Sequence, residues 1–147
     1  MPIRLNVNNT LGNIIFKKNG GLIRNYLVNE NPIKKLDIQV FFANKLLNSG
    51  YNPFIEVKFK SMYSDREKRI EIVSEKDRHI NIYKISKFVH FDRDAIELNR
   101  LSEEIKKTYC DNDFEINSIL LFNEEFDRTF VLQQIENLHL AVKVEKI

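Results

Sequence analysis

The tripeptide Glu56-Val57-Lys58 has the acid–x–lysine spacing that many metal-dependent nucleases use. In such enzymes the carboxylate on a strand binds Mg²⁺, while the lysine positions water or phosphate. The site also needs a further acid on a neighbouring strand, and no Asp before Phe54 occupies a suitable position, while Asp65 follows in a loop. The stronger interpretation is the exposed charged face of a strand. A nuclease that uses Glu56 and Lys58 is kept as an alternative.

Other residue types that perform catalysis or bind metals are scattered along the chain. The histidines, His79, His90 and His139, fall on different predicted elements, and their spacing indicates no metal site. Cys110 is alone, so it excludes an internal disulfide and the Cys-x-x-Cys motif of redox proteins. Its acidic neighbours disfavour a reactive thiolate. We therefore expect a protein that is not an enzyme and has no catalytic, cofactor-binding or metal-binding residue.

The basic residues are concentrated in the first half of the chain. Residues 1–69 contain 12 Lys or Arg and 5 Asp or Glu, whereas residues 70–147 contain 11 and 16, for a total net charge of +2. Basic side chains neutralise phosphates and release counterions, so a basic half favours an anionic partner such as RNA. The RNA-binding candidates are Arg4, Lys17, Lys18, Arg24, Lys34, Lys35, Lys58, Lys60, Arg66, Lys68 and Arg69.

Length and composition are typical of a globular protein. The chain has 147 residues, 43% of them hydrophobic, which predicts one domain. No apolar run approaches the ~18 residues of a membrane helix. The first residues show neither a secretory hydrophobic region nor the Arg- and Ser-rich pattern of an organelle transit peptide. The chain is expected to be cytosolic, internally targeted or already processed.

A helix at 31–50 and a strand at 54–60 form the best-defined part of the pattern. Asn31-Pro32 suits a helix start, and Gly50 supplies the left-handed residue that commonly ends one. Strict alternation in the strand places Ile55, Val57 and Phe59 on one side. Within the helix, adjacent Phe41 and Phe42 cannot both enter one core, so one of them is predicted to face a protein partner.

The remaining segments alternate in type. Residues 14–16 are predicted to form a short strand or a packed arm. Strands are predicted at 22–28, 68–73 and 78–85, the last two as a hairpin. Asp94 is predicted to cap a helix at 94–109. A strand at 115–122, a helix at 124–137 and a strand at 138–144 follow. Ile70, Ile72, Ile80 and Ile82 are predicted to share the core side of the hairpin.

This order predicts an α+β or α/β fold with a thioredoxin-like β-α-β-β-β-α domain that lacks the redox cysteines, followed by a C-terminal β-α-β extension. The first two strands would be parallel, joined by a right-handed crossover. We expect a basic N-terminal arm at 1–21, the thioredoxin-like domain at 22–110, and the extension at 111–147 packed on it.

The order of several short motifs resembles the mitochondrial small-subunit ribosomal protein twenty-five family over residues 2–109. These motifs are Pro2-Ile3-Arg4, Gly12-Asn13-Ile14-Ile15-Phe16-Lys17, Asn25-Tyr26, Val40-Phe41-Phe42 and Asn52-Pro53 before a hydrophobic strand. The family has a thioredoxin-like domain without redox cysteines. Related domains occur in a mitochondrial large-subunit ribosomal protein and in an accessory subunit of respiratory complex I.

The resemblance implies a non-catalytic structural component of the small subunit of the mitochondrial ribosome, located in the matrix. Its partners would be ribosomal RNA and neighbouring ribosomal proteins, with no membrane and no small-molecule substrate. The alternative from the same fold is an accessory subunit of complex I, and the second alternative is the Glu56–Lys58 nuclease.

Overall fold

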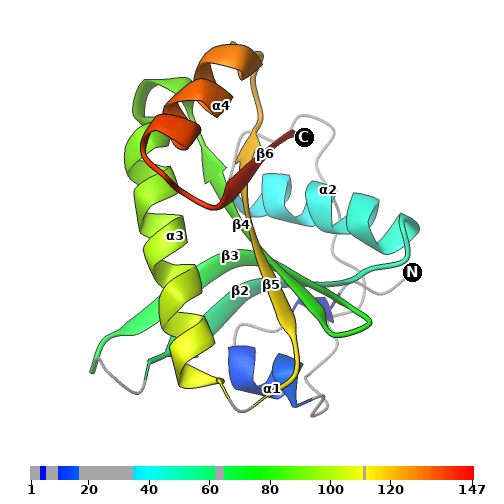
Figure 1. The fold of residues 1–147 in the computed structure, drawn as a ribbon. Helices are drawn as coiled ribbons and strands as arrows, with labels where there is room; N and C mark the ends of the chain where they lie inside the picture. The colour runs from blue at the N-terminus through cyan, green and yellow to red at the C-terminus, as the bar shows by residue number, and fades with distance from the viewer. Residues whose placement is uncertain (1–3, 6–9, 17–34, 62–64, 111) are drawn as a thin grey trace.

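The computed structural model describes residues 4–5, 10–16, 35–61, 65–110 and 112–147. Within these ranges the elements alternate between helices and strands (Figure 1). In chain order they are β1 Arg4–Leu5, α1 Leu11–Ile15, α2 Lys35–Asn48, β2 Asn52–Lys60, β3 Glu67–Lys76, β4 His79–Ser86, the 3₁₀-helix η1 Phe88–His90, α3 Phe91–Thr108, β5 Glu115–Phe122, α4 Arg128–Asn137 and β6 Val142–Lys146.

The described strands form one mixed sheet of six strands in the order β1-β2-β3-β4-β5-β6. β3 runs antiparallel to its neighbours, and the other adjacent pairs, β1–β2, β4–β5 and β5–β6, are parallel. The mixed α/β class is therefore confirmed. The predicted strand at 22–28 lies outside the described residues, so the thioredoxin-like plan that begins with it stays a prediction. No described helix has the length and apolar character needed to cross a membrane.

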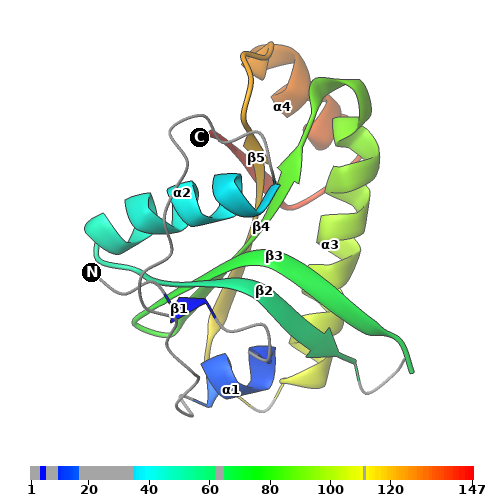
Figure 2. The ribbon, with the colours of Figure 1, turned by 180° about the vertical axis from the view of Figure 1, so that it is seen from behind.

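Helices cover both faces of this sheet, as the two opposite views show (Figures 1 and 2). On one face α2 buries Val40, Phe42, Ala43 and Leu46 against the strands. The larger core lies on the other face, where α1, α3 and α4 pack. The central strands are buried on both sides, which is why the sequence of β5 is an almost continuous apolar run.

Strict alternation fails in β2, where the prediction that Ile55, Val57 and Phe59 share a side is wrong. Ile55 belongs to the α2-side core, whereas Val57 and Phe59 belong to the α3-side core. Glu56, between them, has a φ of 53°. A left-handed residue of this kind disturbs the pleat as a β-bulge does, so the strand changes which residues face each side.

The same change occurs in the partner strand. Ile70 and Val73 face α3, while Ile72 faces α2, so the predicted common side for Ile70, Ile72, Ile80 and Ile82 is also wrong. Glu71 sits at the reversal, on the strand next to Glu56. The two reversals let one hairpin contribute apolar residues to both cores.

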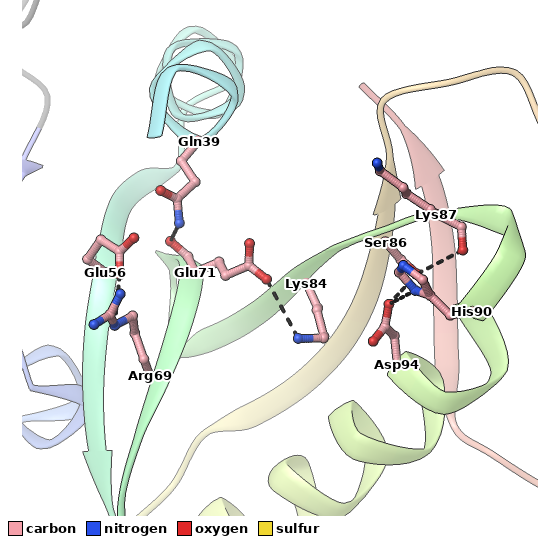
Figure 3. A network of polar contacts seen from close by, with 9 residues as sticks. All are labelled: Gln39, Glu56, Arg69, Glu71, Lys84, Ser86, Lys87, His90 and Asp94. Carbon is pink, nitrogen blue, oxygen red and sulfur yellow. Dashed lines mark hydrogen bonds and ion pairs between the residues drawn. The ribbon is translucent and has the colours of Figure 1, made fainter. Parts of the chain in front are cut away.

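Helix ends follow local chemistry. Gly50 has a φ of 88° just after α2, which confirms its predicted role, and Phe42 is buried while Phe41 stays 38% exposed. The prediction that Asp94 caps its helix is wrong, since α3 begins at Phe91. Asp94 is instead buried and accepts a hydrogen bond from Ser86 at 2.6 Å, with His90 Nδ1 2.9 Å from the same oxygen (Figure 3).

Both ends of the chain contribute to the larger core. Residues 14–16, predicted as a short strand or a packed arm, include the end of helix α1, whose Leu11 and Ile14 are buried. The segment 111–147, predicted as an extension, supplies β5 and β6 to the sheet and α4 to its surface. β5 matches its predicted range, and α4 begins later than predicted because Asp127 caps it by accepting from Phe130 N.

Tyr83 occupies the α2 side of β4. Its ring lies 5.1 Å from that of Phe42, and its hydroxyl is 3.2 Å from Ser74 Oγ. Burial raises the pKa of Tyr83 to about 12. Because the ionised phenol is disfavoured in the folded state, this group favours folding fully below pH 10 and loses that contribution as the pH rises toward 12.

We predict that the free energy of unfolding falls by up to about 3 kcal/mol more in the wild type than in Tyr83→Phe between pH 9 and 12. Urea unfolding curves at several pH values measure this difference. Other groups titrate in the same range, but they do so in both proteins and cancel in the comparison. Parallel stability curves for the two proteins above pH 10 would contradict the prediction.

Candidate functional site

The candidate site lies where β3 and β4 separate. These strands are paired from Lys76 and His79 only as far as Ile72 and Tyr83. Beyond that point β3 stays with β2, whereas β4 stays with β5. Figure 1 shows β3 diverging from β4, with α3 running along the same side of the sheet. A wedge between two strands exposes side chains that an intact sheet would cover.

Glu71 and Lys84 are the first residues beyond the separation, one on each strand. They point toward each other, with Lys84 Nζ 3.8 Å from Glu71 Oε1 (Figure 3). The Glu71 side chain is 8% exposed and that of Lys84 is 31% exposed. A buried carboxylate is stable only when opposite charge or hydrogen bonds compensate for lost hydration, and the ammonium supplies this charge.

Gln39 of α2 ties the backbone at this position to the opposite layer. Its side chain is fully buried, and Nε2 donates to the carbonyl oxygen of Glu71 at 3.0 Å. Because this bond crosses from helix to strand, it holds Glu71 at the point where the strand reverses its pattern. The Glu71 side chain is thereby presented from a fixed backbone.

A cleft of about 320 Å³ opens in front of this pair, between the hairpin and α3. α3 lines it with Glu97, Leu98, Arg100 and Leu101, and the described strand residues that line it include Lys68 and Arg69. Four basic and two acidic side chains are therefore among its described lining residues. A concave site with an excess of positive charge attracts anionic ligands.

The rim cations differ in how strongly they are engaged. Lys68 forms an ion pair with Glu104 at 2.8 Å, and Arg69 contacts Glu56 at 3.1 Å while its side chain stays 71% exposed. Arg100 is exposed and has no ion-pair partner among the described residues. Arg69 and Arg100 are thus the cations best able to reach a ligand in the cleft.

Of the predicted RNA-binding residues, the structure brings one group together. Lys58, Lys60, Arg66, Lys68 and Arg69 all lie at the end of the β2–β3 hairpin. Arg4 and Lys35 begin β1 and α2, and their side chains lie outside the description. The same holds for the whole of the remaining candidates, Lys17, Lys18, Arg24 and Lys34.

Glu56 and Lys58, the predicted nuclease pair, are each engaged by the neighbouring strand. Glu56 contacts Arg69, and Lys58 lies 3.9 Å from Glu67. Neither residue lines the cleft. The acid–lysine pair that does line it, Glu71 and Lys84, is contributed by two strands and has no tripeptide signature in the sequence.

The other candidates for chemistry are dispersed in space. His79 lies 3.1 Å from Glu115 at the start of two paired strands, and Cys110 is exposed. His90 contacts buried Asp94 beside Ser86, but the carboxylate stands between serine and histidine (Figure 3). A nucleophilic serine needs contact with the histidine itself, so this network is structural. Among the described residues, no three His, Cys, Asp or Glu side chains form a metal-binding group.

Comparisons with known proteins show a fold but no family. No protein-family model matches the sequence, and no curated protein matches it. The structure is similar to the crystal structure of AF1548, a protein of unknown function, with a TM-score of 0.58 and 13% sequence identity. The match covers 77% of this chain and 58% of that chain. This chain therefore corresponds to less than two thirds of that protein, and the likeness concerns the fold alone.

We predict that Glu71 and Lys84 stabilise the fold jointly. Lys84→Met removes the charge that compensates a buried carboxylate and is expected to lower the free energy of unfolding by about 2 kcal/mol. In the double variant with Glu71→Gln, most of that loss should disappear. A double-mutant cycle in urea measures the coupling, expected at about 1 kcal/mol because Lys84 is partly solvated. Additive effects of the two substitutions would show that the pair is not coupled.

Proposed function

We propose that this protein binds a nucleic-acid backbone in the cleft between the β2–β3 hairpin, β4 and α3. The observation that supports this most directly is the basic rim of the cleft, where Arg69 and Arg100 are exposed on two elements that face each other across it. Guanidinium groups suit phosphate because their planar donors can bind two oxygens at once. The neighbouring lysines at the hairpin end extend the positive surface beyond the cleft.

The specific form of this proposal is a structural role on ribosomal RNA. It rests on the family resemblance in the sequence, which suggests the small subunit of the mitochondrial ribosome and a thioredoxin-like domain. The basic hairpin end supports contact with RNA, and exposed Phe41 supports contact with a neighbouring ribosomal protein. Localisation in the mitochondrial matrix belongs to the same proposal.

We predict that the protein binds a fluorescein-labelled 20-nucleotide single-stranded RNA in a salt-dependent manner. Replacing Arg69 and Arg100 together with Ala should reduce the slope of log affinity against log salt by about 2, one for each phosphate contact that is lost. Fluorescence anisotropy between about 50 and 300 mM KCl measures the slope.

The matched control is Lys106→Ala with Lys107→Ala. These residues also carry two positive charges on α3, but they lie at its exposed C-terminal end and do not line the cleft. The control should retain the slope of the wild type. Equal losses in the two double variants would mean that net charge, and not the cleft, drives binding.

A metal-dependent phosphodiester hydrolase is a second candidate, because Glu71 and Lys84 face each other inside the cleft. Mg²⁺ commonly binds to one or two carboxylates while water and substrate phosphates complete its shell. Glu71 would supply such a carboxylate, and Lys84 would orient a phosphate or an attacking water. This pair replaces Glu56 and Lys58 in the nuclease hypothesis because it lines a cavity.

For this second candidate, we predict that RNA or plasmid DNA is cleaved only with Mg²⁺ or Mn²⁺ present. Glu71→Gln should lower the rate at least 100-fold, whereas Glu56→Gln should leave it within about threefold. Gel analysis of purified variants, with folding verified by circular dichroism, gives both rates. Absence of cleavage by the wild type with either metal would eliminate the hydrolase and leave the binding proposal intact.

A further inference from the structure

A second concave surface lies on the α2 side of the sheet. The groove has a volume of about 640 Å³ and runs from the end of α2 across β4 and β5 to β6. It forms because α2 packs mainly over β2 and β3. Its size falls in the range of about 300–1,000 Å³ that is typical of small-molecule sites.

The floor of the groove is a row of hydrogen-bonded polar side chains across three strands. Asn117 Nδ2 donates to Asn81 Oδ1 at 3.1 Å, and Asn81 Nδ2 donates to Ser74 Oγ at 3.1 Å. Ser74 Oγ in turn lies 3.2 Å from the Tyr83 hydroxyl. Since Ser74 and Tyr83 are almost fully buried, the row is anchored in the core and fixes its outer members.

Asn117 is the member of the row that remains available to a ligand. It is partly exposed and lines the groove. One of its two N–H groups is used by Asn81, and its Oδ1 has no hydrogen-bond partner among the described residues. An amide with one free donor and one free acceptor matches the edge of a planar group that carries both, such as a nucleobase.

The walls of the groove add positive charge and aromatic surface. Four lysines line it, Lys45, Lys76, Lys143 and Lys146, against the acids Asp77 and Glu145. Lys76 Nζ lies 5.2 Å from the centre of the Tyr51 ring, so an aromatic face and a cation occur together at one end. Lysines attract phosphate as point charges, and aromatic rings stack on bases.

We propose that this groove binds a nucleoside phosphate, with the base against Asn117 and the phosphate among the lysines. The proposal does not depend on nucleic-acid binding in the cleft, which lies on the α3 side. It assigns the protein a small-molecule ligand, which the sequence did not predict.

Isothermal titration calorimetry of the full chain with AMP, GMP, CMP and UMP tests the proposal. At least one nucleotide is expected to bind with a Kd below about 1 mM and at least tenfold more tightly than its nucleoside or inorganic phosphate. Asn117→Ala should weaken that nucleotide at least tenfold, because the amide contacts are lost. Lys143→Ala should weaken it about threefold and reduce its salt dependence.

The controls separate this site from the cleft and from misfolding. Arg100→Ala should leave nucleotide affinity unchanged because Arg100 lines the other site. If Asn117→Ala unfolds, exposed Lys143→Ala provides the test, since its side chain does not enter the core. The proposal is overturned if no nucleotide binds below 1 mM, if phosphate alone binds equally well, or if the groove substitutions leave the affinity unchanged.

Discussion

The separation of β3 from β4 is the constraint on which the rest of the structure depends. Up to Ile72 and Tyr83 the two strands share backbone hydrogen bonds, and beyond them each strand follows a different neighbour. Unpaired edges inside a protein must be filled or compensated. α3 packs its apolar side along the wedge, and the Glu71–Lys84 pair occupies the point of divergence. Core and cleft therefore arise from one feature.

The reversal of side-chain orientation in β2 and β3 belongs to the same feature. With unbroken alternation, Ile55, Val57 and Phe59 would serve one core, and the other face of the hairpin would be charged. The left-handed backbone of Glu56 divides them between two cores, and Glu71 marks the corresponding step on β3. Gln39 fixes that step from the α2 layer through its bond to the Glu71 carbonyl group. Both helical layers thus help to place one carboxylate.

Local patterns predicted most elements, because caps, turns and periodicity act over a few residues. The strand 115–122 and the role of Gly50 follow directly from an apolar run and from glycine's access to positive φ. The pleat reversal at Glu56 was not predictable, because nothing about a glutamate marks a left-handed position. Asp94 resembled a cap because of its spacing, yet its contact with Ser86 of β4 depends on tertiary structure.

The candidate site was missed for a related reason, although a signal existed. The β3–β4 turn consists of Asp77 and Arg78, both with positive φ, and counting back from such a two-residue turn places Glu71 opposite Lys84. The charge distribution along the chain also misled, because Lys84 and Arg100 come from the acidic half but line the basic cleft. A sheet brings together residues that are distant in sequence, so the charge that a ligand meets is set by strand order. In this protein that order places cations of both halves around one buried acid, and the cleft is defined by their convergence.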